Sequence, residues 1–168
     1  MPEELDTAST LKQLEKRVEE LEAVRDITRL RAEFHRSLNN REWDTLAGLF
    51  TDDAHLDYGE YGQAHGSREV RDYYGQLLEQ IRDMRNATAI LLKNFIHGHQ
   101  VHLQGENTAT GVCFFEEQIR FNQDSHAFSS IGQFSDKYVR IGDRWYFAKV
   151  ELDHYWVVPD NDGWRWPW

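Results

Sequence analysis

The feature that most constrains the fold is a change of hydrophobic period after Asn86. Before this residue, apolar side chains recur every three or four positions, which is the spacing of helices with one buried face. After it come four long β segments separated by turn residues, predicted at 88–103, 108–121, 127–141 and 145–158. Helices followed by an antiparallel meander predict an α+β fold. Long N-terminal helices are expected to pack on one face of a curved, mainly antiparallel β-sheet.

A long helix opens the chain and is predicted to end at Asn39-Asn40, because asparagine tolerates the left-handed conformation common after a helix. Its first turns carry apolar residues at the 3-4 spacing of a short coiled-coil seam: Leu11, Leu14, Val18 and Leu21. The apolar phase then shifts to a second set that includes Phe34, which argues against a long coiled coil. We expect the first turns to pack on a neighbouring subunit or on the outside of the domain itself.

Three shorter elements connect the long helix to the strands. Asp44 is predicted to cap a second helix that reaches Phe50. A short strand follows at 54–58, and two glycines close it. Ser67 is predicted to cap a third helix that extends to Ile81.

The chain is predicted to form one domain with an extension at each end. Residues 1–23 are an N-terminal helical extension, 24–158 the domain and 159–168 an aromatic tail. A length of 168 residues suffices to bury one core. The tail, with tryptophans at 164, 166 and 168, is too aromatic for a solvated end. It is expected to pack on a neighbouring subunit or to cover a pocket, so we expect a homo-oligomer, either a trimer or a dimer.

Composition excludes several partners. The net charge is −10, whereas nucleic acids and anionic membranes attract clusters of Lys and Arg. We find no apolar run long enough to cross a membrane, and the lone Cys113 fits a reducing compartment, so a cytoplasmic location is expected. Aromatic residues reach 13%, which predicts either a well-filled core and interface or a pocket for a flat apolar ligand.

Strand alternation predicts a set of ionisable side chains inside the sheet. His97 and His99 would share the inward face of the first long strand, and Glu117 would face inward beside Phe115 on the next. A buried charge is costly unless it is paired, and a carboxylate that orients an imidazole suits proton transfer near neutral pH. His97 is therefore the predicted proton shuttle, held by Glu117 or His99.

Two other interpretations of the same residues stay open. The histidines and Glu117 are satisfied core or interface groups in a noncatalytic binding or assembly module. Alternatively, His97 and His99 bind a metal ion with Glu117 or His154 as a third ligand, although the sequence has no other metal motif. Tyr58 would donate a hydrogen bond to a substrate oxygen, and His154 would line the mouth of the pocket.

Four stretches resemble the SnoaL-like branch of the NTF2-like superfamily over residues 24–158. They are the helix end and following helix at 39–46, the short strand at 55–58, the segments 94–98 and 105–111, and the segments 134–138 and 141–146. The resemblance implies a cone made by a bent sheet and helices, with the ligand in its open end. The pattern is most similar to scytalone dehydratase and bile-acid 7α-dehydratase, which implies a trimeric lyase that needs no cofactor.

The resemblance also assigns residues one at a time. Tyr58 matches the pocket tyrosine of these dehydratases, His97 matches a pocket histidine, and Glu117 falls near an acidic residue on the neighbouring strand. Two positions depart from the pattern, because Asn39 replaces an acidic residue and Asn94 replaces a histidine. The acid–base groups are therefore rearranged in this chain.

The activity expected from these residues is acid–base elimination on a bulky hydrophobic aromatic or polycyclic substrate. Either water or a small fragment such as formaldehyde would leave, the latter from a diarylpropane. We expect the substrate to contact, besides the catalytic residues His97, Tyr58 and Glu117, a second set: Phe34, Asn39, Asp57, Asn94, His99, Phe115 and His154.

Overall fold

The computed structural model describes residues 2–84, 86–122 and 127–159. The helices are α1 (Pro2–Asn40), α2 (Trp43–Ala47), the 3-10 turn η1 (Gly59–Tyr61) and α3 (Gly66–Met84). The strands are β1 (Phe50–Asp57), β2 (Gln63–His65), β3 (Ile90–Leu103), β4 (Thr108–Phe121), β5 (Ala127–Ile141) and β6 (Arg144–Pro159). The predicted α+β class is confirmed, and the four long strands differ from their predicted bounds by two residues at most.

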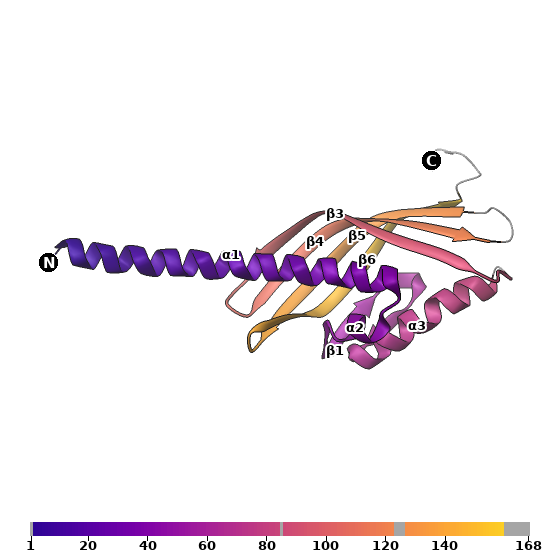
Figure 1. Ribbon diagram of the computed structural model, residues 1–168, viewed down its shortest axis with the longest axis horizontal. Helices are drawn as coiled ribbons and strands as arrows, with labels where there is room; N and C mark the ends of the chain where they lie inside the picture. Colours follow the sequence, from indigo (N-terminus) through magenta and orange to yellow (C-terminus); the bar gives the residue numbers. More distant parts are fainter. Residues whose placement is uncertain (1, 85, 123–126, 160–168) are drawn as a thin grey trace.

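The six strands form one mixed sheet in the order β2-β1-β6-β5-β4-β3. All neighbours are antiparallel except β1 and β6, which run parallel. The sheet bends over α3 and over the second half of α1, so that helices and strands enclose a cone (Figure 1). A core rich in aromatic side chains lies between the helices and the sheet, with the Phe34 ring in contact with the rings of Phe134 and Phe147.

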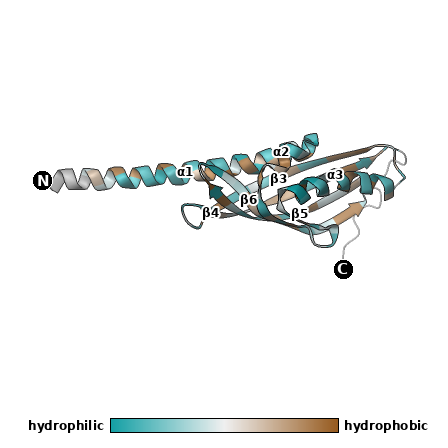
Figure 2. Ribbon diagram, turned by 90° about the horizontal axis from the view of Figure 1, so that it is seen from below, coloured by the Kyte–Doolittle hydropathy of each residue, from teal (hydrophilic) through white to brown (hydrophobic). Residues whose placement is uncertain are grey.

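Helix α1 extends well beyond the rest of the domain. It ends at Asn40, as predicted, and the chain reverses at Arg41, which has a positive φ of 61°. The N-terminal half extends beyond the sheet in both views (Figures 1 and 2). The four seam residues are exposed rather than packed on the outside of the domain: Leu11, Leu14, Val18 and Leu21.

The segment after α1 differs from the prediction in two ways. Helix α2 begins at Trp43 and is only five residues long. Asp44 does not cap it but pairs with Arg71 of α3, so the acidic side chain fastens two helices together. Strand β1 begins at Phe50 because its backbone pairs with β6, a parallel contact that local sequence patterns do not report.

Strand β3 contains a break that changes which side chains face the core. The register with β4 shifts between His97 and Gln100, and Gly98 in this break has a positive φ of 61°. An extra residue in one strand reverses the alternation beyond it. Asn94 and Ile96 therefore face inward before the break, and His99 faces inward after it.

None of the helices in the described ranges combines the length and the apolar composition that crossing a bilayer requires. The aromatic tail predicted to cover a pocket or a neighbouring subunit lies at 160–168, outside the described residues.

Candidate functional site

A row of three polar side chains crosses the inner face of the sheet. Glu117 of β4 pairs in register with Asn94 of β3 on one side and with Ser130 of β5 on the other. The amide Nδ2 of Asn94 donates to Glu117 Oε2 at 2.6 Å, and Ser130 Oγ donates to Oε1 at 3.3 Å. Both oxygens of the carboxylate are therefore held from the flanking strands. The prediction that Glu117 faces inward is confirmed.

The surroundings of Glu117 favour its protonated form more than water would. Burial raises the pKa of Glu117 above the ordinary glutamate value, although the hydrogen bonds from Asn94 and Ser130 act in the opposite direction. Asn94 and Ser130 are buried, whereas Glu117 keeps some exposure. A carboxyl group that is oriented, reachable and raised in pKa is a candidate general base or acid.

Aromatic side chains lie near this carboxylate. Burial first, and the negative charge of Glu117 second, raise the pKa of Tyr73 on α3. The Tyr73 hydroxyl donates to the carbonyl oxygen of Tyr61 in η1 at 3.0 Å. The Tyr61 ring packs on His154 of β6 with 4.6 Å between centroids, and His154 packs on Phe115 at 5.3 Å. His154 is half-buried against Phe115, and burial lowers its pKa below the ordinary histidine value of 6.5; that it lines the mouth of a pocket stays a prediction.

Tyr58 lies deeper, at the end of β1. Its hydroxyl forms a hydrogen bond with the hydroxyl of Tyr74 on α3, and its ring packs against Tyr73 and Phe134. Burial raises the pKa of Tyr58 far above that of a free phenol. Tyr58 is therefore a neutral donor or acceptor rather than a phenolate.

His97 is not inside the cone, and its predicted place is wrong. Its side chain is 59% exposed on the outer face, with Nε2 at 3.7 Å from Oε2 of Glu116. The break at Gly98 is the physical reason, because it places His97 and His99 on opposite faces of β3. The predicted pairing of His97 with Glu117 is therefore excluded.

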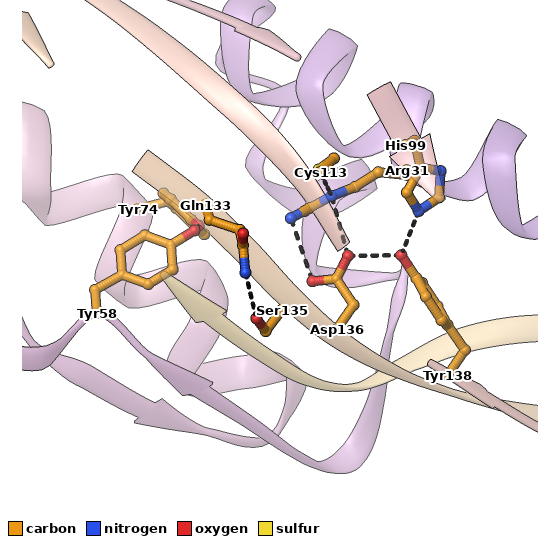
Figure 3. Close-up of polar contacts among 9 residues, drawn as sticks. All are labelled: Arg31, Tyr58, Tyr74, His99, Cys113, Gln133, Ser135, Asp136 and Tyr138. Carbon is orange, nitrogen blue, oxygen red and sulfur yellow. Dashed lines mark hydrogen bonds and ion pairs between the residues drawn. The ribbon is translucent and has the colours of Figure 1, made fainter. Parts of the chain in front are cut away.

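A second polar group lies in the core and was missed by sequence reasoning (Figure 3). Arg31 of α1 and Asp136 of β5 form an ion pair in which neither side chain has any exposed surface, with Nε at 3.2 Å from Oδ2. Arg31 Nε also lies 3.4 Å from Cys113 Sγ. The hydroxyl of Tyr138 donates to Asp136 Oδ2 at 2.6 Å, and Nε2 of His99 lies 3.1 Å from that hydroxyl.

The hydrogen bonds of this chain decide the tautomer of His99. Tyr138 uses its only proton on Asp136, so the Nε2 of His99 must donate to the tyrosine oxygen. The Nδ1 of His99 is then an acceptor, and it has no partner among the described residues. Burial, and secondly the charge of Arg31, lower the pKa of His99 to about 4. The ring is neutral at physiological pH.

The low pKa of His99 predicts a loss of stability in mild acid. An unfolded histidine titrates near 6.5, so the unfolded chain binds more protons than the folded one between about 6.5 and 4. Stability is then complete above pH 6.5 and falls as the pH decreases to about 4. Urea unfolding across this range measures the slope. His99→Gln should make it shallower without removing it, because burial also lowers the pKa of His35, whereas His102→Gln, on the exposed outer face of the same strand, should leave it unchanged; equal slopes for both variants would contradict the assignment.

Three of the predicted substrate contacts make structural contacts within the chain. Phe34 has no exposed surface and is surrounded by other aromatic rings in the core. Asp57 accepts hydrogen bonds from the Gly59 amide at 2.9 Å and from Gln63 at 3.1 Å, which closes the turn after β1. Asn39 holds the end of α1 against β3, through two 2.7 Å hydrogen bonds with the backbone of Asn94.

The geometry does not assemble the metal site considered from the sequence. His97 and His99 face opposite sides of β3. Within 2–84, 86–122 and 127–159, no three His, Cys, Asp or Glu side chains lie close enough together to hold a metal ion.

Two surface grooves lie away from the polar row. One, of about 350 Å³, runs between α1 and the β5–β6 turn and is lined by Asp26, Arg29, Leu30, Glu33, Leu49, Asp143, Arg144 and Trp145. The other, of about 390 Å³, lies where α2, β1 and the start of α3 meet. Neither groove is lined by Glu117, Asn94 or Ser130. The candidate site therefore rests on the oriented carboxylate of Glu117 and not on these grooves.

Comparison with known proteins agrees with this architecture. The model of the SnoaL-like domain matches residues 19–151, which is most of the chain. The chain belongs to the SnoaL-like family. This family assignment confirms the resemblance seen in the sequence, and the helix-wrapped sheet is the NTF2-like cone that the resemblance implied.

Solved structures share the fold of this SnoaL-like protein at low identity. One is a protein from Novosphingobium aromaticivorans that carries the provisional name scytalone dehydratase, with 17% identity and a TM-score of 0.71 over 83% of this chain and 89% of that one. Another is the hexachlorocyclohexane dehydrochlorinase LinA-type3 from Novosphingobium barchaimii, with 13% identity and a TM-score of 0.74 over 89% and 97%. A third, of unknown function, is Rv3472 from Mycobacterium tuberculosis, with 16% identity and a TM-score of 0.67 over 81% and 73%.

Proposed function

We propose that this SnoaL-like protein is a cofactor-independent lyase whose proton-transferring group is Glu117. The observation that carries the proposal is the carboxylate held on the inner face by Asn94 and Ser130, with its pKa raised by burial. A base of this kind removes a proton next to a leaving group when the substrate lies against the sheet. Two proteins with the same fold have names that are consistent with elimination chemistry. One is provisionally named a dehydratase, and the other is a dehydrochlorinase.

The walls around Glu117 favour a flat or bulky hydrophobic substrate. Tyr61 and His154 are in ring contact on one side, with the buried Phe115 edge-on behind His154, and Tyr73 lies on the helical side. Aromatic walls give large contact area with little loss of side-chain entropy. The neutral imidazole of His154 can donate a hydrogen bond to a developing or leaving oxygen, while the hydroxyl of Tyr73, whose proton is bonded to the Tyr61 carbonyl, can accept one from a substrate hydroxyl.

Tyr58 keeps its proposed role as a donor in a modified form. Its hydroxyl is bonded to Tyr74, so the two phenols act as one buried unit behind Tyr73. Such a pair orients the inner wall of the pocket and donates to a substrate group that reaches it. His97 has no part in this mechanism, because it lies on the outer face.

A noncatalytic binding module is the second candidate, and one observation favours it. Both oxygens of Glu117 already have protein partners, as expected of a carboxylate that only shapes a pocket. This candidate predicts tight binding of aromatic ligands without turnover. The quenching of tryptophan fluorescence measures such binding.

A turnover screen of metal-stripped protein separates the two functions. The panel contains hydroxylated polycyclic compounds, diarylpropanediols and halogenated cyclohexanes, and mass spectrometry detects the loss of water, formaldehyde or hydrogen halide. Turnover of any member that is unaffected by chelator is the expected result. Ligand binding with no product from the whole panel would favour the binding module instead.

A further inference from the structure

The projecting half of α1 presents an apolar seam that its own domain does not cover. Leu11, Leu14, Val18 and Leu21 are 55%, 48%, 54% and 68% exposed. Every described residue from 7 to 22 is exposed, so this half of the helix makes no packing contact that buries it. Isolated helices are marginal in water, and most helical stability in proteins comes from packing an apolar face. We therefore expect this seam to pack against a partner.

The spacing of the seam matches one heptad assignment. Leu11 and Val18 take the a positions, and Leu14 and Leu21 take the d positions. Val18, the β-branched residue of the two a positions, together with leucine at both d positions favours two strands over three or four. The next a and d positions are Arg25 and Thr28, both exposed, so the seam ends just before the helix enters its domain.

The charges beside the seam select a second copy of the chain in parallel orientation. Arg17 is at position g and Glu22 at position e, five residues further along. In a parallel pair, position g of one helix lies beside the following e position of the other, so Arg17 meets Glu22 twice by symmetry. An antiparallel pair would instead bring Glu15 and Glu22, both at e, against each other.

We propose that this chain forms a parallel two-stranded coiled coil with a second copy of itself through α1. The seam of Leu11, Leu14, Val18 and Leu21 is the interface, and the Arg17–Glu22 pairs set its orientation. Both domains then lie at the same end of the coil. This assembly is independent of the proposed enzymatic function and of any contact between sheets.

Cross-linking of the full chain tests the orientation directly. At a d position of a parallel pair the two Cα atoms are close enough for a disulfide, so Leu14→Cys should give a covalent dimer on mild oxidation. Lys16→Cys is the matched control, because position f points away from the partner. The native Cys113 is buried and should not interfere. A monomer from Leu14→Cys, or equal cross-linking of both variants, would overturn the proposal.

Sedimentation equilibrium tests the interface and its charges. Leu14→Glu should weaken self-association through α1 at least a hundredfold, because it buries a charge in the seam. It should also reduce the helical circular dichroism signal, since the projecting half loses its partner. Arg17→Glu should weaken association roughly fivefold, and Arg17→Glu with Glu22→Arg should restore it. Association unchanged in both Leu14→Glu and Arg17→Glu would overturn the proposal and point to another surface.

Discussion

Asp136→Asn is expected to lower the free energy of unfolding by about 3–5 kcal/mol, because it leaves a buried charge without its partner. Arg31 has no exposed surface, and the carboxylate of Asp136 is its opposite charge. Burial alone would lower the pKa of Arg31, but the summed attraction of Asp136, Cys113 and Tyr138 raises it, so the guanidinium stays protonated. Urea unfolding at pH 7 measures the loss.

Two variants make this measurement decisive. Asp44→Asn removes the carboxylate from the exposed pair with Arg71 and should cost far less, because exposed ion pairs contribute little to stability. The double change Arg31→Met with Asp136→Leu removes both buried charges and should recover most of the loss, because hydrophobic replacements of buried pairs are often neutral. Similar losses from Asp136→Asn and Asp44→Asn would show that the core pair is not formed.

Glu117→Gln is expected to lower kcat by about 10²–10⁴, with folding intact, because the amide cannot accept the proton that the carboxylate removes. The comparison requires a substrate from the turnover screen. Glu116→Gln is the matched control, since Glu116 is the adjacent residue of β4 and lies on the outer face beside His97. A comparable loss of activity in both variants would contradict the assignment.

The pH profile gives an independent test of Glu117. A general base works in its deprotonated form, so kcat/KM should rise with pH through the pKa of this carboxyl group. Because burial raises that pKa, the midpoint should lie above the ordinary glutamate value of 4.5. Asn94→Ala and Ser130→Ala should move the midpoint further up, because each removes a donor that stabilises the carboxylate. A midpoint unmoved by either change would assign the profile to another group.

The fold was readable from the sequence because its signals are local. Turn residues between the long β segments located the hairpins of β3–β6, and Asn39-Asn40 located the end of α1. The parallel pairing of β1 with β6 was not predictable in this way. This pairing joins segments about one hundred residues apart, and the local sequence of neither strand indicates which strand it pairs with.

The candidate site was only partly predictable, for two physical reasons. Strict alternation placed Glu117 correctly, since β4 has no break against β5. It misplaced His97, because Gly98 inserts a change of phase into β3. An isolated glycine inside a strand pattern is a known sign of a bulge and was the available signal.

The buried ion pair could have been predicted from the positions of its two residues on the apolar faces of their elements. Arg31 lies four residues after Ile27 and three before Phe34, on the apolar stripe of α1. Asp136 alternates with Phe134 and Tyr138 on the inward face of β5. A cation and an anion, each at a core position of its own element, are expected to meet, because neither is stable there alone.

Asn39 joins the end of α1 to the strand residue that orients Glu117. An amide donates and accepts at once, and Asn39 uses both functions on the peptide of Asn94, as a neighbouring strand would. An aspartate at this position would keep only the acceptor and would face the Asn94 carbonyl with a negative charge. The end of α1 therefore fixes the position of Asn94, and through it the orientation of the Glu117 carboxylate on the sheet.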